Sequence, residues 1–479
     1  MSEANRAELL RLQALAAPLE PGEEEREALA SAALGHAQQY LGDLPDGPAN
    51  HGWDDVLAER LEPEFAEEGR RLDATLAYLG RSVDRPGITT ASPRFMGYVP
   101  GGGLFYSAVG DFLAAASNKY AGFASAAPGA VRLENATTAW LAQAIGFPAS
   151  AAGTLTSGGS TANLAAIVAA REARDEEGGG AIYLTRFAHH CIDKALRIAG
   201  RQRAPRRLIA TDERHRMRAD ALADALERDR ASGVRPWLVV ASAGTVDTGA
   251  VDPLTEIADL CCRYGAWFHV DGAYGGLFML CEEGRQVLSG IERADTAALD
   301  PHKTLFLPYG TGAVVARDGR TLLDAFSASA DYIQPLGESD VGPSPGDLSP
   351  ELTRHFRALR LWLPLQLAGV AAFRAAQSEK IRLARYFHAR LAEMEGWEVG
   401  PPPDLSIVAF RFRPPHGDVD AFNRNLLRRL QQEGRVFLSG TRIGGADWLR
   451  CAILSFRTHL AHVDETLDVL VRLAAAEAE

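Results

Sequence analysis

Cysteine is scarce in this sequence, and its few copies are arranged neither for cross-linking nor for metal binding. Five cysteines occur among 479 residues, which is an odd number, and no two of them have the spacing of a CxxC motif. A disulfide framework and a zinc site are therefore not supported, and we expect no bound metal.

Long hydrophobic runs and an excess of positive charge are also absent. The longest apolar candidate, residues 361–373, is short and contains Gln366, so it predicts a buried helix and not a membrane span. The N-terminus has no basic start followed by an apolar core, so no signal peptide is expected. The net charge of −12 argues against a general affinity for nucleic acid or anionic membranes. We expect a cytoplasmic protein without either kind of partner.

The composition is ordinary for a folded globular protein of more than one domain. Hydrophobic residues make up 47% of the 479 residues and charged residues 23%, which is enough for a large core. Residues 1–90 are polar with helical leucine spacing, which predicts an N-terminal helical arm. Because the arm has little apolar surface of its own, it must dock on the rest of the chain or on a partner subunit.

Residues 153–318 alternate between short apolar runs and helical stretches, which is typical of an α/β domain with a mostly parallel sheet. The apolar runs cover residues 181–184, 208–210, 237–241, 267–270, 296–299 and 313–315. Ligands of such sheets bind at the carboxyl ends of the strands. Asp271 and Lys303 follow two of these runs, so we expect both at one edge of the sheet, within a large domain of residues 91–385.

The segment 331–352 is dense in proline, glycine, serine and acids and has no periodicity, which predicts a mobile functional loop or a disordered one. A long helix is expected from 353 to 385, with a kink at Pro364. Residues 386–479 are typical of a small α+β C-terminal domain. Its expected strands are 407–412 and 449–454, and its expected helices are 419–433 and 462–474.

A carboxylate and an amine are thus expected close together. A buried lysine amine can lose its proton and condense with an aldehyde, and a buried carboxylate can hold a pyridine nitrogen protonated. Lys303 and Asp271 together therefore indicate a site for pyridoxal 5'-phosphate (PLP). Taken singly, a lysine after a histidine is usually a solvated surface residue, and an aspartate at a strand end is often a helix cap.

Three further positions have a functional and an ordinary interpretation. Residues 158–161 (GGST) open a helix, where N–H groups and hydroxyls could bind a phosphate or form an ordinary cap. They match neither a Walker A motif nor a GxGxxG motif. His189 could stack on an aromatic cofactor or be a hydrogen-bonded strand-end histidine. Thr245 could donate to a ring oxygen or cap a turn.

The chain resembles the PLP-dependent group II amino acid decarboxylases in five segments that occur in the family's order. These segments are TSGGSTANL, HHCIDKALRIAG, ASAGTVDTGAVDPL, FHVDGAYGG and ADTAALDPHKTL. The family includes aromatic L-amino acid, histidine, tyrosine and glutamate decarboxylases, and the resemblance extends from about Ser92 to Thr458. It implies the type I PLP-dependent, aspartate aminotransferase-like α/β fold and a homodimer with active sites at the interface.

The resemblance also implies roles for individual residues of a PLP site. Lys303 would be the Schiff-base lysine, and Asp271 would pair with the pyridine nitrogen. Ala273 and His189 would lie against the two faces of the ring. The remaining residues expected to contact the cofactor, most of them at its phosphate, are Gly159, Ser160, Thr245, Thr296, Asp300 and His302.

The substrate pocket implied by the resemblance contains residues from distant parts of the chain. Tyr98, Val99 and Pro100 would form one wall, and Phe123 would come from the other subunit. Arg450, in the C-terminal domain, would lie near the substrate. Ser92 stands where the family often has a histidine, and the small side chains of the pocket leave the size of the substrate open.

The implied reaction is decarboxylation of an L-amino acid, with aromatic substrates favoured, to the amine and CO2. The family's mobile loop usually carries a tyrosine that supplies a proton, yet residues 336–352 contain neither tyrosine nor histidine, and Tyr332 precedes them. Relatives without this tyrosine can react with oxygen and release an aldehyde. Transamination, carbon–carbon lyase activity and a PLP-binding role with little catalysis are also compatible with a PLP site. The sequence around His189 and Lys303 favours decarboxylation.

Overall fold

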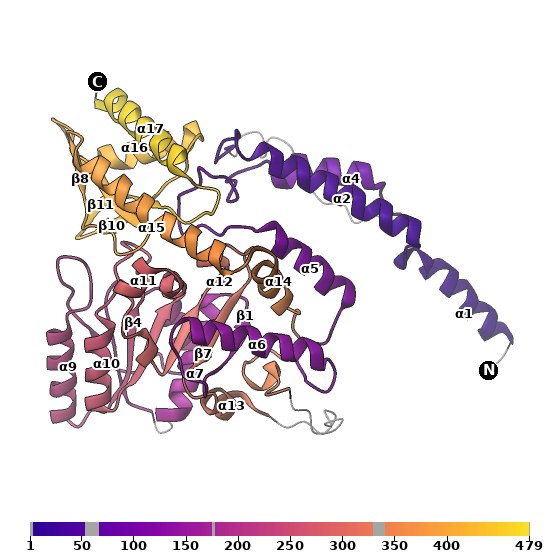
Figure 1. Ribbon diagram of the computed structural model, residues 1–479, viewed down its shortest axis with the longest axis horizontal. Coiled ribbons are helices and arrows are strands. Elements are labelled where there is room, and N and C mark those ends of the chain that lie inside the picture. The colour runs from indigo at the N-terminus through magenta and orange to yellow at the C-terminus, as the bar shows by residue number, and fades with distance from the viewer. Residues whose placement is uncertain (1–2, 53–66, 175–177, 329–340, 479) are drawn as a thin grey trace.

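A seven-stranded sheet lies at the centre of the large part of the molecule (Figure 1). The computed structural model describes residues 3–52, 67–174, 178–328 and 341–478. The strand order of the sheet is β1-β7-β6-β5-β4-β2-β3. The strands are β1 (Ala152–Thr156), β2 (Ala181–Leu184), β3 (Arg206–Leu208), β4 (Pro236–Ser242), β5 (Trp267–Gly272), β6 (Thr296–Leu299) and β7 (Gly312–Ala316).

The sheet is mostly parallel, as the alternating sequence pattern predicts. β3, β2, β4, β5 and β6 pair in parallel, whereas β7 pairs antiparallel with both β6 and β1. Strands β4 to β7 are buried on both faces, which is why they occur in the sequence as continuous apolar runs. The sequence does not predict β1, because its segment, AGTLT, contains no such run.

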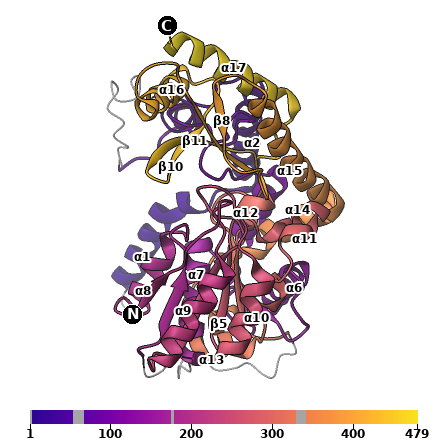
Figure 2. The same cartoon turned by 90° about the vertical axis from the view of Figure 1, so that its left-hand side faces the viewer.

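Helices cover both faces of this sheet, so its strands form a middle layer (Figure 2). One face packs against α6 (Pro128–Ala144), α9 (Ala219–Ala231) and α10 (Leu254–Tyr264). The other face packs against α7 (Gly159–Arg174), α8 (Cys191–Ile198) and α13 (Arg320–Phe326). α7 and α8 begin at the sheet edge where β4, β5 and β6 end, and this arrangement brings their N-termini to the carboxyl ends of the strands.

The long helix expected at 353–385 consists of two helices, α14 (Ala358–Ala368) and α15 (Val370–Ala392). Pro364 lies inside α14 and does not end it. The chain turns at Gly369, whose φ of +74° lies in the left-handed region that glycine adopts without strain. α14 packs on α5 (Phe105–Ser117) of the large part.

A second, four-stranded antiparallel sheet is formed by the C-terminal part of the chain (Figure 2). Its order is β10-β11-β9-β8. The elements are β8 (Trp397–Val399), β9 (Ile407–Phe412), β10 (Ser439–Ile443) and β11 (Ala446–Ala452), with helices α16 (Val419–Glu433) and α17 (Leu460–Ala478). Its core also contains Met96 and the second half of α15, so α15 crosses the boundary expected near residue 385 and joins the two sheets.

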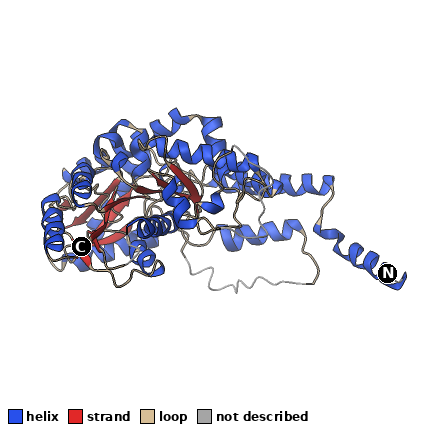
Figure 3. Ribbon diagram, turned by 90° about the horizontal axis from the view of Figure 1, so that it is seen from below, coloured by secondary structure: helices blue, strands red, loops and turns tan. Residues whose placement is uncertain are grey.

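The N-terminal helices extend away from the rest of the molecule (Figures 1 and 3). They are α1 (Glu3–Ala16), α2 (Glu23–Asp43) and the short α4 (Leu72–Leu79), and none of them has a buried side chain. α2 and α4 contact each other. In the described residues these helices make few contacts with the rest of the chain.

The segment expected to be a mobile loop is described only from residue 341 onward, and residues 331–340 lie outside the described part. Residues 341–352 pack against the loop between α5 and α6: the Gly346 N–H donates to the Gly122 carbonyl at 3.0 Å. Asn135 Nδ2 donates to the Val341 carbonyl at 2.8 Å. No helix in the described part of the chain is both long enough and apolar enough to cross a bilayer.

Candidate active site

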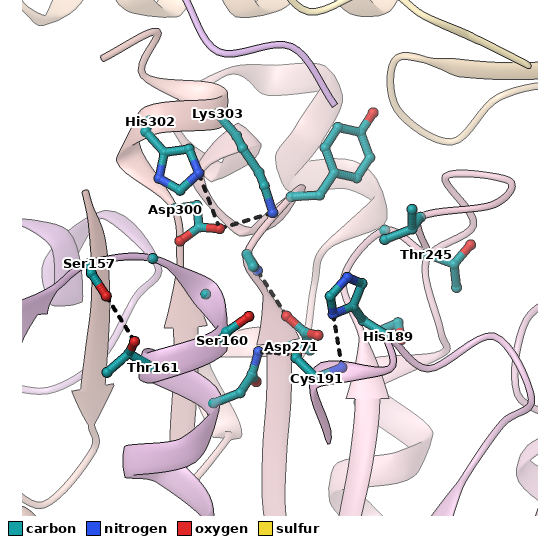
Figure 4. A pocket seen from close by; sticks show the side chains of 18 of the residues that line it. Ser157, Ser160, Thr161, His189, Cys191, Thr245, Asp271, Asp300, His302 and Lys303 are labelled. Atoms are coloured by element: carbon teal, nitrogen blue, oxygen red, sulfur yellow. Dashed lines mark hydrogen bonds and ion pairs between the residues drawn. The ribbon is translucent and has the colours of Figure 1, made fainter. Parts of the chain in front are cut away.

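A cavity of about 280 Å³ lies where β4, β5 and β6 end and where α7 and α8 begin (Figure 4). Most of its lining side chains are polar or ionisable. They include Ser157, Ser160, Thr161, Asn163, His189, Cys191, Thr245, Asp271, Asp300, His302 and Lys303. The apolar part of the lining consists of Phe187, Val246, Ala273 and Tyr274. The sheet edge therefore gathers side chains that the sequence separates by nearly 150 residues.

Lys303 and Asp300 form an ion pair on one side of this cavity (Figure 4). Both follow β6, and the short helix α12 (Pro301–Thr304) places Lys303 one turn after Asp300. Lys303 Nζ lies 2.9 Å from Asp300 Oδ2. Burial lowers the pKa of Lys303, but the nearby carboxylate of Asp300 outweighs burial, so the pKa of Lys303 is raised above its ordinary value. The amine is therefore protonated at neutral pH.

His302 lies beside the same carboxylate. Its Nδ1 lies 2.6 Å from the carbonyl of Thr311, so Nδ1 carries the proton and Nε2, at 3.7 Å from Asp300 Oδ2, is left without one. Burial lowers the pKa of His302. Asp300 Oδ1 is buried and has no hydrogen-bond partner among the described residues. A buried carboxylate oxygen without a donor indicates that this side of the cavity is built to hold another polar group.

Asp271 ends β5 and faces the cavity (Figure 4). Its Oδ1 accepts the N–H of Ala273 at 3.2 Å. This single local bond fixes the carboxylate and leaves the rest of its acceptor capacity directed at the cavity. β5 lies between β4 and β6 in the sheet, so Asp271 is held by paired strands on both sides.

His189 lies across the cavity from Lys303, in the turn between β2 and α8 (Figure 4). Its Nδ1 accepts the N–H of Cys191 at 3.2 Å, so a neutral His189 has its proton on Nε2. Burial lowers the pKa of His189, and the carboxylate of Asp271 opposes this effect only in part. At neutral pH the imidazole is therefore uncharged, which suits it to stack on a ring.

The glycine turn at the start of α7 forms the end of the cavity nearest Asp300. A Cβ on Gly159 would lie 2.8 Å from Asp300 Oδ2 and 2.9 Å from the Cβ of Ala273, so no larger residue fits here. The first N–H groups of any helix have no intrahelical acceptor, and the helix dipole adds positive potential at the same point. Ser157 Oγ and Thr161 Oγ1 lie 2.9 Å apart beside the turn. The turn thus has the features of an anion-binding site.

Thr296 does not belong to this cavity, and the phosphate contact implied by resemblance is not supported. It is the first residue of β6, whereas Asp300 follows the last one, which separates them by roughly 13 Å along the strand direction. The Thr296 hydroxyl accepts from Trp267 Nε1 at 3.0 Å and contacts His269 Nδ1 at 3.0 Å. The sequence pattern could not distinguish the two ends of this strand.

Arg450 does not line the cavity. It bonds to the backbone of the segment that contains Tyr98, Val99 and Pro100. Its Nε donates to the carbonyl of Val246 at 2.6 Å, and its Nη1 donates to the carbonyl of Tyr98. Burial lowers the pKa of Arg450 to about 10, so the side chain remains cationic at neutral pH. The contacts of Arg450 are therefore with the wall of the pocket.

The other predicted substrate residues do not line the described cavity. Tyr98 has a φ of +48° and is 59% exposed. Val99 and Pro100 lead to Gly101, where a Cβ would lie 3.1 Å from the carbonyl oxygen of His302. Phe123 pairs with Tyr120 in the loop between α5 and α6, with ring centroids 6.0 Å apart. Its assignment to a neighbouring subunit's site stays a prediction.

Three residues that line the cavity were not predicted from the sequence. Asn163 follows Gly159 by four residues, so both lie on the same side of α7. Cys191 is two residues from His189. Tyr274 is fixed by a distant part of the chain: its hydroxyl lies 2.8 Å from Ser406 Oγ and accepts the Ser406 N–H at 2.9 Å. Only the first two could have been found from spacing, because Ser406, between β8 and β9 of the second sheet, is far from Tyr274 in the sequence.

Comparison with known proteins agrees with this geometry. Residues 57–413 match the model of the pyridoxal-dependent decarboxylase conserved domain. The chain is 34% identical to the aromatic-L-amino-acid decarboxylase of Bacillus atrophaeus over 95% of this chain and 96% of that protein. It is 28% identical to the phenylacetaldehyde synthase of Arabidopsis thaliana over 80% and 82% of the two chains. The crystal structure of Oryza sativa TDC with PLP and tryptamine aligns with a TM-score of 0.87 at 27% identity, covering 96% of this chain and 100% of that one.

The chain belongs to the family of pyridoxal-dependent decarboxylases. It is accordingly a lyase that decarboxylates an amino acid, PLP is its cofactor, and its fold is the type I fold of this cofactor's enzymes. The cavity fits the group. An anion site at the glycine turn, a carboxylate for a ring nitrogen and an amine for an aldehyde line one cavity, and Asp300 Oδ1 still lacks a donor among the described residues.

Proposed function

We propose that this chain decarboxylates an aromatic L-amino acid to the corresponding amine and CO2, in the cavity between α7, α8 and the ends of β4 to β6. The observation that carries the proposal is the placement of Lys303, Asp271 and His189 around one cavity from three separate elements. The aromatic preference is supported by the relatives, which include an aromatic-L-amino-acid decarboxylase.

The residues proposed to hold the cofactor occupy different sides of the cavity. Gly159, Ser160 and His302 would receive the phosphate, and Asp271 would face the ring nitrogen. Ala273 and His189 would lie against the two faces of the ring, with Thr245 at its edge. Lys303 would bond to the aldehyde carbon. When bound, PLP supplies an electron sink for the electron pair that remains after CO2 leaves.

The charges of the site support this assignment. Asp271 would pair with the ring nitrogen, where a carboxylate favours the protonated form of that nitrogen. Lys303 holds its proton at Nζ through Asp300, 2.9 Å away, so Asp300 is the nearest base that can receive this proton when the amine reacts. His189 presents a neutral ring whose Nε2–H can donate to a carboxylate or a hydroxyl at the open side. Because Asp300 already pairs with Lys303, we assign its carboxylate to the lysine and not to the phosphate.

The substrate side chain is proposed to lie against the segment that contains Tyr98, Val99 and Pro100. Arg450 fixes this segment and the Thr245-containing loop relative to each other through the carbonyls of Tyr98 and Val246. Tyr98 is 59% exposed, so its ring offers an aromatic surface for an aromatic substrate side chain.

A homodimer is proposed as the working assembly, with Phe123 contributed across the interface. α1 and α2 have no buried side chain, although several leucines lie on them. The exposed leucines are Leu9, Leu10, Leu12, Leu15, Leu29 and Leu34. Burying each such side chain is worth about 1.5–3 kcal/mol, and a twofold dimer would cover both arms at once.

The sequence of the loop suggests an alternative product. Residues 336–352 contain neither tyrosine nor histidine, so the usual proton donor of the family is missing from this stretch. Decarboxylation with oxidative deamination to an aldehyde is therefore the alternative, and the similarity to a phenylacetaldehyde synthase supports keeping it. The amine remains the main proposal because the decarboxylases include the relative with 34% identity.

The domain division and the location of the protein are further proposals. Separate hydrophobic clusters in the two sheet-containing parts support a helical arm to residue 90, a large domain to 385 and a small domain to 479. The five cysteines are free, which supports a reducing, cytoplasmic setting.

Incubation of the purified enzyme and PLP with single L-amino acids tests the function. We expect CO2 and the amine in equal amounts, with the highest kcat/KM for tryptophan, tyrosine or phenylalanine. Aldehyde with hydrogen peroxide in place of the amine would establish the alternative product. Keto acid without CO2 would contradict both.

A further inference from the structure

A chain of buried hydrogen bonds lies directly beneath the cavity, and none of the proposed roles accounts for it. Trp267 Nε1 lies 3.0 Å from Thr296 Oγ1, which lies 3.0 Å from His269 Nδ1. His269 Nε2 lies 2.7 Å from Asn163 Oδ1, and Asn163 Nδ2 lies 3.5 Å from Cys191 Sγ. His269, Asn163 and Thr296 are fully buried. Such a network is costly to leave incomplete.

The direction of each bond follows from the orientation of the Asn163 amide, whose Nδ2 faces Cys191 Sγ and whose Oδ1 faces His269. Asn163 presents its carbonyl oxygen to His269, so His269 must carry its proton on Nε2. The other ring nitrogen, Nδ1, is then an acceptor, and the Thr296 hydroxyl donates to it. That hydroxyl in turn accepts from the indole of Trp267. All five groups are satisfied in a single arrangement, and this arrangement requires a neutral His269. Burial, which lowers the pKa of His269 to about 4, provides that charge state.

The chain joins the four elements that carry the cofactor-site residues. His269 lies two residues before Asp271 on β5, so both side chains point to the same face, roughly 7 Å apart. Thr296 begins β6, which leads to Asp300 and Lys303. Asn163 lies one turn into α7 from Gly159, and Cys191 begins α8 directly after the turn with His189. Asn163 and Cys191 also line the cavity themselves.

We propose that His269 is a positioning residue of the PLP site, which acts by bonding Thr296 on β6 and Asn163 on α7 and thereby fixes Asp271 relative to the glycine turn and to His189. The inference rests on the proposed cofactor site. Loss of one central bond would leave a buried hydroxyl or amide without a partner, so β5 and α7 would shift apart until water or a rearranged side chain satisfies them. A shift between these two elements changes how the ring and the phosphate are held together.

Thr296 offers a test that distinguishes this role from a direct phosphate contact. Thr296→Val keeps the shape of the side chain and removes its hydroxyl, whereas Thr296→Ser keeps the hydroxyl. We would titrate the cofactor-depleted full-length variants with PLP and with pyridoxal, which lacks the phosphate, and record binding by absorbance and by quenching of tryptophan fluorescence. For Thr296→Val we expect affinity to fall by about tenfold for both ligands. For Thr296→Ser we expect binding close to that of the wild type.

Two further variants separate positioning from loss of stability. His269→Gln should weaken both ligands in the same way as Thr296→Val and should shift the absorbance band of bound PLP. His388→Gln is the matched control, because His388 is a partly buried histidine of the small domain that bonds to the Gly400 carbonyl at 2.9 Å. Its thermal midpoint should fall while its PLP affinity and absorbance band stay those of the wild type.

The outcomes that overturn the inference are distinct. If Thr296→Val and His269→Gln bind both ligands as the wild type does, the network has no role in positioning. If Thr296→Val weakens PLP and leaves pyridoxal unchanged, Thr296 acts on the phosphate and the inference is wrong. If the wild type binds no PLP, the proposed cofactor site itself fails, and this inference fails with it.

Discussion

At the scale of single residues, the site depends on how neighbouring charges set the protonation of three groups. Lys303 is buried, and burial alone would remove its proton, yet the carboxylate of Asp300 reverses the direction of the shift. His189 and His269 have no comparable partner, so burial keeps both imidazoles neutral. The sequence indicates which residues meet in the site, but the sign of each pKa shift depends on distances that only the folded chain provides.

Replacing Asp300 should change the titration of the lysine. In Asp300→Asn the pKa of Lys303 should fall, because the carboxylate that holds its proton is gone. The pH dependence of the rate at which the cofactor-depleted enzyme bonds to added PLP would record this change, because only the uncharged amine reacts with the aldehyde. Asp220→Asn, which removes an exposed partner of Arg218, is the control and should leave the profile in place. An unchanged profile in Asp300→Asn would show that the ion pair is unimportant.

His269 should contribute to the pH dependence of stability. Its folded-state pKa of about 4 lies below the ordinary value of 6.5, so the unfolded state binds more protons between these values. Stability is therefore fully present above pH 6.5 and is lost as the pH falls toward 4. Between pH 6.5 and roughly pH 5 the wild type should lose about 2 kcal/mol more than His269→Gln does. Urea unfolding at a series of pH values measures the difference, and parallel curves would contradict it.

At the scale of elements, a buried ion pair fastens the segment that follows the loop. Glu134 on α6 and Arg354, before α14, are both fully buried, and Glu134 Oε1 lies 2.8 Å from Arg354 Nη2. The same carboxylate oxygen accepts the N–H of Leu155 on β1 at 3.0 Å. One pair thus joins a helix, a strand and the exit of the loop. The sequence could not predict the pair, because 220 residues separate its members.

Replacing one member of this ion pair should destabilise the protein more than replacing both members. Glu134→Gln leaves a buried guanidinium without its counter-charge and should destabilise the protein by about 3–5 kcal/mol. The double variant Glu134→Gln/Arg354→Met should recover part of that loss, since no uncompensated charge remains. Chemical unfolding of the three proteins tests this order. A double variant less stable than Glu134→Gln would contradict the explanation.

The sequence predicts elements well where a local pattern determines them. β2, β6, β9 and α16 have the bounds that the sequence predicts, because apolar runs and helical periodicity are local properties. It does not predict β1 and β10, since their short segments mix glycine and threonine with few apolar residues. It also assigns the break at Gly369 to Pro364, because the sequence does not reveal which residue has a positive φ.

At the scale of the whole molecule, the helical arm is the part least explained by a single chain. α1 and α2 carry exposed leucines and extend from the body (Figure 1), which is unfavourable unless another surface covers them. The sequence predicts that the arm must dock and leaves open whether it docks on its own chain. In the described residues α1 and α2 pack on neither sheet, and this result favours a second copy as the partner.

Charged residues on the arm should dissociate the proposed dimer. The double variant Leu9→Glu/Leu12→Glu places two acids on the leucine face of α1 and should convert dimer to monomer with little effect on the circular dichroism of the body. Analytical ultracentrifugation measures the mass. Leu208→Glu, at an exposed leucine of β3 far from the arm, should remain dimeric. A wild type that is monomeric at micromolar concentration would refute the assembly.

The central claim is that Lys303 is the residue that binds the cofactor covalently. The sequence contains four lysines, Lys119, Lys194, Lys303 and Lys380, so the attachment point can be identified without ambiguity. The holoenzyme is reduced with borohydride, digested and analysed by mass spectrometry. The account predicts one modified peptide, which contains Lys303, and none in Lys303→Ala. A phosphopyridoxyl group on another lysine, or none on Lys303, would contradict it.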